Sequence, residues 1–503
     1  MAGVLGEPQE GDAAKERASR DEPGVGGTPK VEAERVDAYM IFLFVLLSTA
    51  TLFDGFDAAM LTVAAPDVRA TLGIGLGEWG YLFAFTRLGM VASFFLLLTA
   101  DRIGRRRLMT WTIVGFALTN GAAGFATDKV EFAIWQFLAR IFLTAEYALA
   151  IIVVGEEFPA RRRGLAIAIL TSFATIGVMI IARVQPYILL RDCVSGTLAA
   201  GNCVAPASNA FRDLGMEAVA TVQTWIGRPV DGADWRILYL IGIAPLTIVF
   251  VLRFALRETR RFAAEQAKRA QESTRFVDML RDEWTKARVP WQPGYRRRTW
   301  LVALLWNCVQ LVTSPAVAYW VIFAREQLHF TPAIVGGIIF WGYAGGVAGN
   351  YLAGFLIERF GRRATVAIVY VFSALSIATL FQVESEVAQY VSMIFTVFGF
   401  GAANTATHVY ASELFPTAIR ATGYGWTTNL FGRVAEFGTP LLIAVLIQQL
   451  GVTISTAVLV VSVGPLIGAA IVWRFAPETR GLTLEEVQQV AAMGHDGTAP
   501  AKT

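Results

Sequence analysis

Cysteine and histidine are both scarce in this chain, with three of each among 503 residues. Metal centres are usually built from close groups of these two residue types, and the sequence contains no such group. It also lacks a glycine-rich phosphate loop and a nucleophile-and-base motif of a hydrolase. We therefore expect no metal site, no cofactor and no enzymatic activity. The net charge of +3 gives no reason to expect a nucleic-acid partner.

Charged residues are the second scarce class. They make up 17% of the chain, whereas hydrophobic residues make up 55% and the mean hydropathy is +0.51. This composition excludes an ordinary soluble domain. The apolar runs are long enough to cross a bilayer, and helices are expected because the period of two of a β-barrel is absent. We predict an all-α integral membrane protein with twelve transmembrane helices, at residues 38–64, 79–99, 108–126, 131–153, 165–190, 235–256, 300–323, 332–356, 366–382, 388–411, 422–448 and 453–475.

The distribution of Lys and Arg orients these helices. With the N-terminus in the cytoplasm, the inner loops hold 23 of these residues and the outer loops hold 7. Because positive charge stays on the cytoplasmic side, we expect both termini in the cytoplasm and the protein in the plasma (inner) membrane. Residues 1–37 are polar and lack the apolar core of a signal peptide, so we expect a disordered cytoplasmic segment. Residues 476–503 are expected to form a cytoplasmic tail.

Two short motifs recur at a single spacing. Asp101-Arg-Ile-Gly-Arg-Arg106 and Glu358-Arg-Phe-Gly-Arg-Arg363 are 257 residues apart, and so are Glu156-x-Phe-Pro and Glu413-x-Phe-Pro. Two motifs with one offset, each between long apolar runs, indicate a duplicated membrane domain of the kind that secondary transporters use. We therefore expect two pseudo-symmetric six-helix bundles, at residues 38–256 and 300–475, joined by a cytoplasmic linker at 257–299.

A third repeat reveals an insertion. Arg257-Glu-Thr-Arg260 and Pro477-Glu-Thr-Arg480 are 220 residues apart, so the first half carries 37 extra residues, which we place in an outer loop at 191–234. This loop contains one helix-like stretch near residues 211–225. A lid over the outer mouth and a tolerated insertion both remain open. Cys193 and Cys203 lie in the same loop, where a disulfide and an incidental pair are equally open.

These motifs resemble a known family. The loop at 101–106 and its echo at 358–363 are similar to the signature loop of the major facilitator superfamily. The Glu-x-x-Pro-x-x-x-Arg blocks and Pro477-Glu-Thr-Arg480 resemble its sugar-porter and metabolite-symporter branches. Carboxylates and guanidiniums at helix ends are able to pair across bundles, so we predict gating roles, with topological anchoring as the alternative. The candidate gating residues are Asp101, Arg102, Gly104, Arg105, Arg106, Glu156, Arg163, Glu358, Arg359, Gly361, Arg362, Glu413, Arg420, Glu478 and Arg480.

Charged groups inside membrane helices are costly, and they mark function by default. Asp54-Gly-Phe-Asp57 resembles the first-span signature of aromatic-acid/proton symporters, and Asp57 with Arg140 matches proton-coupled sugar porters. The resemblance implies proton coupling: a buried carboxylate gains a proton when its arginine moves away and loses it when they meet. A static ion pair is the alternative. The candidate coupling residues are Asp54, Asp57, Arg140 and Glu146, the last in a Thr-Ala-Glu-Tyr segment similar to that of metabolite symporters.

The helix rise places Asp54, Asp57, Arg87, Arg140 and Arg183 about 11–15 Å below the outer surface, where they are expected to form one charged layer. Three Arg against two Asp favour an anionic substrate. The second half offers mainly neutral donors instead. The candidate substrate-binding residues are Arg87, Arg183, Asn307, Gln310, Tyr319, Asn404, Asn429 and Arg433.

We predict a monomeric secondary transporter in the lipid bilayer that carries a small organic acid (a carboxylate) together with a proton by alternating access. The alternatives are proton-coupled sugar or polyol uptake, proton antiport that exports a small organic molecule, and a transporter-like sensor that moves nothing.

Overall fold

The computed structural model describes residues 38–97, 104–158, 160–189, 210–227, 235–243, 288–415 and 419–479. Several predictions fall outside these residues: those on the first 37 residues, on the greater part of the linker and on the tail from Arg480, together with Asp101, Arg102, Cys193 and Cys203. Four predicted site residues lie in described helices, but their side chains are outside the description: Glu156, Arg163, Arg420 and Asn429.

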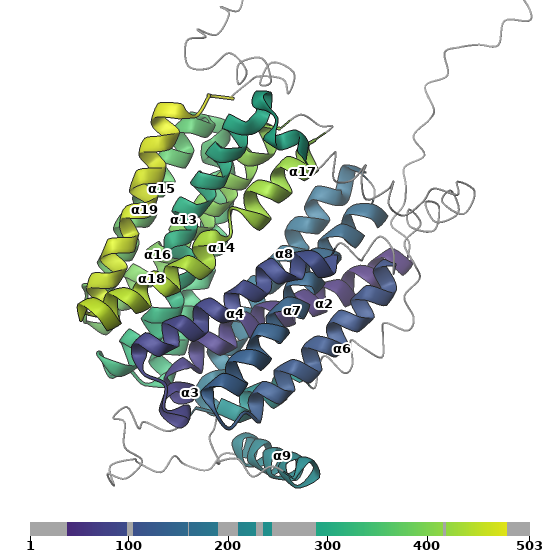
Figure 1. Cartoon of the computed structure of the whole chain (residues 1–503), viewed down its shortest axis with the longest axis vertical. Coiled ribbons are helices and arrows are strands. Elements are labelled where there is room, and N and C mark those ends of the chain that lie inside the picture. The colour runs from purple at the N-terminus through teal and green to yellow at the C-terminus, as the bar shows by residue number, and fades with distance from the viewer. Residues whose placement is uncertain are drawn as a thin grey trace, which may run out of the picture.

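The described chain is helical and forms two groups of helices that lie side by side (Figure 1). The first bundle contains α2 (Ala38–Val63), α3 (Ala65–Leu72), α4 (Leu76–Leu97), α6 (Arg105–Gly124), α7 (Lys129–Glu157), α8 (Ala160–Val184), the short turn η1 (Gln185–Tyr187), α9 (Ala210–Ile226) and a helix at 235–243. The second contains η2 (Val289–Trp291), α13 (Pro293–Glu326), α14 (Pro332–Phe360), α15 (Arg362–Leu380), α16 (Glu386–Glu413), α17 (Arg420–Tyr424), η3 (Gly425–Leu430), α18 (Val434–Leu450) and α19 (Ile454–Phe475). The predicted all-α, two-bundle fold class is confirmed.

Among the described residues, nine helices are long and apolar enough to cross a membrane, and α18 is a shorter apolar helix. Apart from the eleventh, each predicted span corresponds to one described helix, although only residues 235–243 of the sixth are described. Helix α13 begins at Pro293, seven residues before the predicted span.

The predicted repeat is visible in the helix boundaries. Helices α6 and α15 begin at Arg105 and Arg362, and each follows a glycine with positive φ, 95° at Gly104 and 90° at Gly361. Residues with a Cβ rarely adopt this conformation. The glycine of the repeated motif is therefore required by the backbone turn between consecutive helices, whatever its neighbours do.

Helices that begin at the opposite end of the bundles use side-chain caps. Asp128, Thr331, Ser385 and Thr453 accept hydrogen bonds from free backbone N–H groups at the starts of α7, α14, α16 and α19. Such caps satisfy donors that lipid is unable to satisfy. We call this end of the molecule the α3 end, because α3 lies there (Figure 1).

The two bundles contact each other at the α3 end. Helix α4 packs on α18, α8 packs on α14, and α3 packs on α13. Arg69 of α3 forms an ion pair with Glu326 at the end of α13. Away from this end the two sets of ribbons diverge, and α2 begins and α19 ends there (Figure 1). The conformation is therefore joined at the α3 end, which the predicted topology places on the outer side.

The eleventh predicted span is not one helix, and the single run at 422–448 is therefore wrong. α17 passes into a π-helical segment, η3, and α18 begins only at Val434. The chain between them turns at residues 431–433, which include Gly432. An interrupted membrane helix frees backbone N–H and C=O groups inside the protein, and in transporters such breaks lie beside binding sites.

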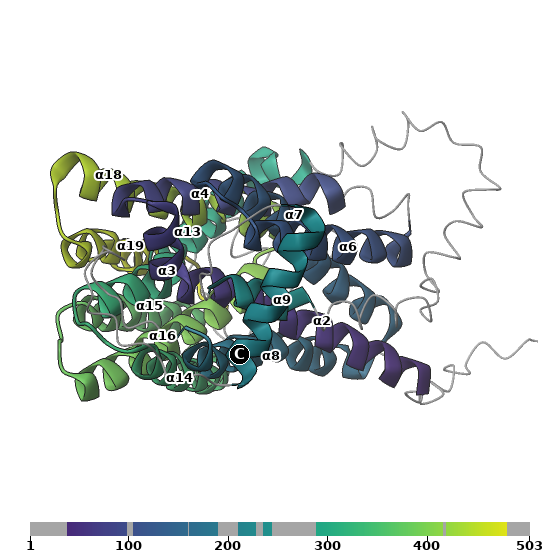
Figure 2. The same ribbon diagram turned by 90° about the horizontal axis from the view of Figure 1, so that it is seen from below.

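The helix-like stretch predicted inside the outer loop is confirmed as α9, which crosses the α3 end of the first bundle (Figure 2). Val219 of α9 is 2% exposed and belongs to the same apolar cluster as Trp235 and Ile237. On another face of the helix, Leu214 and Trp225 are exposed. The helix thus docks on the bundle through one face only.

Candidate functional site: a charged layer between the bundles

A cavity of about 300 Å³ lies between the two bundles. Eight of its lining residues are apolar and seven are polar, so convergent polar groups face an apolar surface of similar extent. The polar side chains that line it come from α2, α4, α13, α14, α16 and α18: Thr62, Arg87, Gln310, Thr313, Tyr343, Asn404 and Glu436. Arg87, Gln310 and Asn404 were predicted. Sequence reasoning missed Tyr343, which carries no distinguishing signal, and left Glu436 out although its charge lies inside a span.

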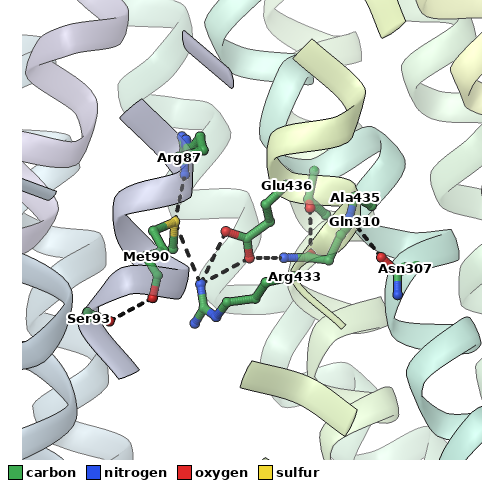
Figure 3. Close-up of polar contacts among 9 residues, drawn as sticks. Arg87, Met90, Ser93, Asn307, Gln310, Arg433, Ala435 and Glu436 are labelled. Carbon is green, nitrogen blue, oxygen red and sulfur yellow. Dashed lines mark hydrogen bonds and ion pairs between the residues drawn. The ribbon is translucent and has the colours of Figure 1, made fainter. Parts of the chain in front are cut away.

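A hydrogen-bonded chain centred on Glu436 forms one wall of this cavity (Figure 3). Arg433 Nη1 donates to both carboxylate oxygens of Glu436, at 3.1 Å each, and Gln310 Nε2 donates to Oε1 at 2.5 Å. The Thr313 hydroxyl donates to the other end of Gln310 at 2.7 Å. Glu436 is 6% exposed. These donors satisfy both oxygens of the buried carboxylate.

Asn307 holds the broken helix in place. Its Nδ2 donates to the carbonyl oxygen of Phe431 at 2.7 Å, and its Oδ1 accepts from the backbone N–H of Ala435 at 2.7 Å. The Ala435 N–H lies in the first turn of α18, where no helical partner is available, whereas the Phe431 carbonyl also accepts a long 3.4 Å contact from the N–H of Val434. Asn307 was predicted as a substrate contact. In the structure its amide instead binds the backbone on both sides of the break, and these contacts fix the turn that carries Arg433.

Arg87 reaches the same region from α4. Met90 Sδ accepts weakly from Arg87 Nη1 at 3.8 Å and from Arg433 Nη1 at 3.9 Å, so one sulfur lies between arginines of the two bundles (Figure 3). The Arg87 guanidinium also stacks over the Phe83 ring, 4.8 Å from its centroid. Its Nε has no hydrogen-bond partner among the described residues.

Asp57 of α2 is the most deeply buried of the predicted coupling aspartates, at 5% exposure. Arg140 of α7, which is 6% exposed, lies within electrostatic reach of it, and the amide of Asn120 on α6 lies beside it. Among the described residues, Oδ1 of Asp57 accepts no hydrogen bond. Neither the amide oxygen nor the amide nitrogen of Asn120 has a hydrogen-bond partner there. A buried carboxylate oxygen that lacks a donor is energetically costly unless it takes up a proton or water.

Asp54 connects this group to the second bundle. It is only half-buried, and Arg140, Glu146 and Arg433 lie within its electrostatic reach. Two close helix contacts fix α2 against α8 beside it: a Cβ at Gly55 would lie 1.8 Å from the carbonyl oxygen of Ala174, and one at Gly177 would lie 1.9 Å from that of Leu52. Only glycine permits this approach of the two backbones, so the register of α2 is set where its aspartates lie.

Glu146 is not among the residues that line the cavity. It is 5% exposed and accepts a 2.6 Å hydrogen bond from the hydroxyl of Thr112 on α6. Four carboxylates (Asp54, Asp57, Glu146 and Glu436) and three guanidiniums (Arg87, Arg140 and Arg433) lie within electrostatic reach of one another in this region. The positive surplus expected from the sequence is therefore not found.

Two predicted substrate residues lie elsewhere. Arg183 is exposed and stacks over the Phe340 ring of α14, 4.5 Å from its centroid. It is not part of the layer, because the end of α8 directs it to the neighbouring helix instead of to α2. Tyr319 is 1% exposed, and its hydroxyl donates to the carbonyl oxygen of Pro440 at 3.3 Å. That contact helps to pack α13 on α18 and leaves no face of the ring on the cavity.

The repeated motif of the second bundle forms a compact cluster at the end away from α3. Arg362 donates to both oxygens of Glu413, with its shortest contact at 2.8 Å. Glu478, beyond α19, accepts from the backbone N–H groups of Arg362 and Arg363 at 2.9 and 3.0 Å. Thr479 donates to Glu413 at 2.6 Å. In this conformation these groups tie α15, α16 and the segment after α19 together within one bundle.

The other candidate gating residues are placed less tightly. Glu358 and Arg359 are exposed at the end of α14. In the first bundle Arg105 is 9% exposed, whereas Arg106 is half-buried. A gating role for both copies of the motif stays a prediction.

Comparison with known proteins identifies the family. The family described as "Sugar (and other) transporter" matches residues 216–491, and the Major Facilitator Superfamily matches residues 47–192. The chain belongs to the major facilitator superfamily. It is a multi-pass membrane transporter and not an enzyme.

Two relatives and one solved structure illustrate the similarity. The chain is 25% identical over 446 residues to the gallate transporter of Pseudomonas putida, covering 84% of this chain and 89% of the relative. It is 23% identical over 422 residues to the cis,cis-muconate transport protein of Acinetobacter baylyi, covering 80% and 86%. The crystal structure of a D-xylose-proton symporter superposes with a TM-score of 0.66 at 17% identity, covering 89% of this chain and all (100%) of the other. That likeness supports the twelve-helix, two-bundle fold.

Proposed function

We propose that this transporter moves a small organic carboxylate into the cell together with protons, as a monomer in the plasma (inner) membrane with both termini in the cytoplasm. The observation that carries the proposal is Asp57: a deeply buried carboxylate with an oxygen that lacks a donor, beside the buried Arg140. Ionisable groups at such depth in a membrane protein mark proton or substrate pathways.

Charge balance favours a carboxylate that enters with a proton. With three guanidiniums and four carboxylates in this region, an added anion increases the excess of acidic over basic groups. A proton on one of the acidic groups offsets the added charge. Excess charge in a poorly solvated site is expensive, so anion and proton stabilise each other when bound. This mutual stabilisation is the energetic requirement for symport.

Alternating access converts that coupling into transport. The bundles are joined at the α3 end in this conformation, which makes the cavity accessible from the cytoplasmic side under the predicted topology. Substrate and proton leave there, the bundles rock about the charged layer, and the empty site returns to the outside. Gallate and cis,cis-muconate, the acids named for two relatives, are carboxylates of a size that suits the cavity.

Uptake of a sugar or polyol is the second candidate. Gln310, Asn404, Thr62 and Tyr343 offer neutral donors and acceptors on the cavity wall, and such groups suit hydroxyl-rich ligands. Gln310 is already engaged with Glu436 and Thr313, however, which leaves fewer free amides than a neutral ligand requires. Proton antiport, with export of the organic molecule, uses the same acidic groups and differs only in direction.

Reconstituted vesicles test the proposal. We expect an inwardly directed proton gradient to drive accumulation of gallate or cis,cis-muconate, and Asp57→Asn to abolish accumulation while counterflow exchange continues. Asp57→Glu is the matched control, and it should retain gradient-driven uptake. If Asp57→Asn accumulates substrate as the wild type does, Asp57 has no coupling role. If the gradient drives export or moves only neutral sugars, the alternatives replace the proposal.

A further inference from the structure

Glu436 holds Arg433 in the way that a bound carboxylate would. Both of its oxygens accept from Arg433 Nη1 at 3.1 Å, Gln310 donates to one of them, and the carboxylate borders the cavity. It stands in the first turn of α18, immediately after the break at residues 431–433. The positive end of that helix dipole adds to the attraction for an anion. Donors converge here on a single carboxylate, which the protein itself supplies.

We infer that Glu436 is a built-in competitor of the substrate carboxylate and a second proton acceptor of the transport cycle. The inference rests on the proposed function and adds to it a proton-binding residue in the second bundle. In the empty site Glu436 is charged and neutralises Arg433. When a proton from cavity water binds Glu436, the guanidinium keeps its charge and turns to the entering carboxylate. When the proton leaves, Glu436 takes Arg433 back and the substrate is displaced.

Geometry supports the competition. Arg433 is held by only one nitrogen on Glu436, and the same nitrogen also contacts Met90 weakly at 3.9 Å. Its side chain is 24% exposed, whereas that of Glu436 is 7% exposed. The arginine is therefore the more accessible partner. Asn307 fixes the turn that carries it, so only the side chain has to move.

Other ionisable groups surround this pair and must be separated from it. On α4, Arg87 lies within electrostatic reach of Glu436, and on α13 Tyr319 contacts Pro440 of the same helix. Asp54 on α2, Tyr147 on α7, His408 on α16 and Tyr424 on α17 lie within reach of Arg433. Of these, His408 has an ordinary pKa nearest to the working pH range, so it is the main rival source of pH dependence.

The test measures binding of gallate and of cis,cis-muconate to the purified full-length protein at pH 5.5, 6.5 and 7.5, with methyl gallate as a neutral analogue. For the wild type we expect the Kd of both acids to rise toward higher pH by up to about a hundredfold per unit, the limit for two linked protons on Asp57 and Glu436. In E436Q we expect a shallower rise of at most about tenfold per unit, because only the proton on Asp57 stays linked to binding. Methyl gallate should show little pH dependence in either protein.

Three further variants keep the result interpretable. E436D should retain the pH dependence, R433Q should weaken both acids at every pH, and H408N should behave as the wild type. Thermal unfolding of each variant establishes that it folds. If E436Q keeps the wild-type pH dependence, or if H408N loses it, the inference is wrong while proton-coupled accumulation through Asp57 still stands. If the wild type binds neither acid at pH 5.5, the proposed substrate class fails as well.

Discussion

The two bundles share one fold, but the polar groups that each places in the charged layer differ in how far their hydrogen bonds are satisfied. In the first bundle, Asp57, Asn120 and Arg87 each keep a buried polar atom without a partner among the described residues. In the second, Glu436, Gln310 and Asn307 are each bound by two or more hydrogen bonds. A buried polar atom that lacks a partner is stabilised when a proton or a ligand binds it, whereas a fully hydrogen-bonded network keeps its side chains in one arrangement. The comparison favours Asp57 of the first bundle as the coupling carboxylate of the proposed function, and Glu436 of the second bundle as a carboxylate whose partners must be released before it takes part.

The repeat makes this division of labour visible. Residues 257 positions after Asp54, Asp57 and Arg140 are Leu311, Ser314 and Val397, so the coupling charges have no counterparts. In the other direction, Arg433 and Glu436 correspond to Ile176 and Met179. Duplication preserved the helix ends and their glycines, while the interior positions diverged. A substitution in one bundle can therefore be compared with a substitution at the equivalent position of the other bundle, which serves as its control.

The largest effect is expected at Asn307, whose counterpart in the unbroken α2 is Ala50. N307A leaves the N–H of Ala435 without a partner and the carbonyl of Phe431 with only the 3.4 Å contact from the N–H of Val434. An orphaned backbone group costs roughly 1–3 kcal/mol, so we expect a clear fall in the thermal unfolding temperature and weaker carboxylate binding through Arg433. A50G, which shortens an equivalent position without touching the break, should change ligand affinity much less. Equal loss of affinity in both variants would remove Asn307 from the support of Arg433.

A smaller and graded effect is expected at the two motif glycines. Both have positive φ, so a Cβ strains the turn by about 1–3 kcal/mol at Gly104 and at Gly361 alike. At Gly361 the new atom would also lie 2.8 Å from an oxygen of Glu478, which binds the start of α15. We therefore expect G361A to lower the unfolding temperature more than G104A. The reverse order would mean that the turn of the first bundle is the more constrained one.

Sequence reasoning could predict these elements because their signals are local. Apolar run length gave the helices, and an offset shared by two motifs gave the bundles. It also found Arg87, Gln310 and Asn404 on the cavity, since a charge or amide inside a span is conspicuous. The i,i+3 spacing also indicates that Arg433 and Glu436 pair along one helix face, as they do. The sequence could not show that Asn307 is used by a broken helix or that Arg183 turns to Phe340. Those outcomes depend on which faces meet across two bundles, and helical periodicity leaves that choice open.

The smallest effect is expected for an ion pair that joins equivalent positions of the two bundles. Arg69 and Glu326 occupy equivalent positions, 257 residues apart, and they form an ion pair across the two bundles at the α3 end. Their side chains are 10% and 34% exposed, so the pair is intermediate between a surface pair and a buried one, and we expect it to contribute about 1–2 kcal/mol.

R69E should shift the population toward opening of this end, with increased labelling of a cysteine introduced at Thr62 on the cavity wall. The double variant R69E/E326R should restore the wild-type labelling, because the pair is re-formed with its charges exchanged. K129E, which breaks the exposed pair with Glu78 inside the first bundle, is the control and should leave labelling unchanged. If the double variant labels as strongly as R69E, the α3 end is closed by helix packing alone and the ion pair is incidental.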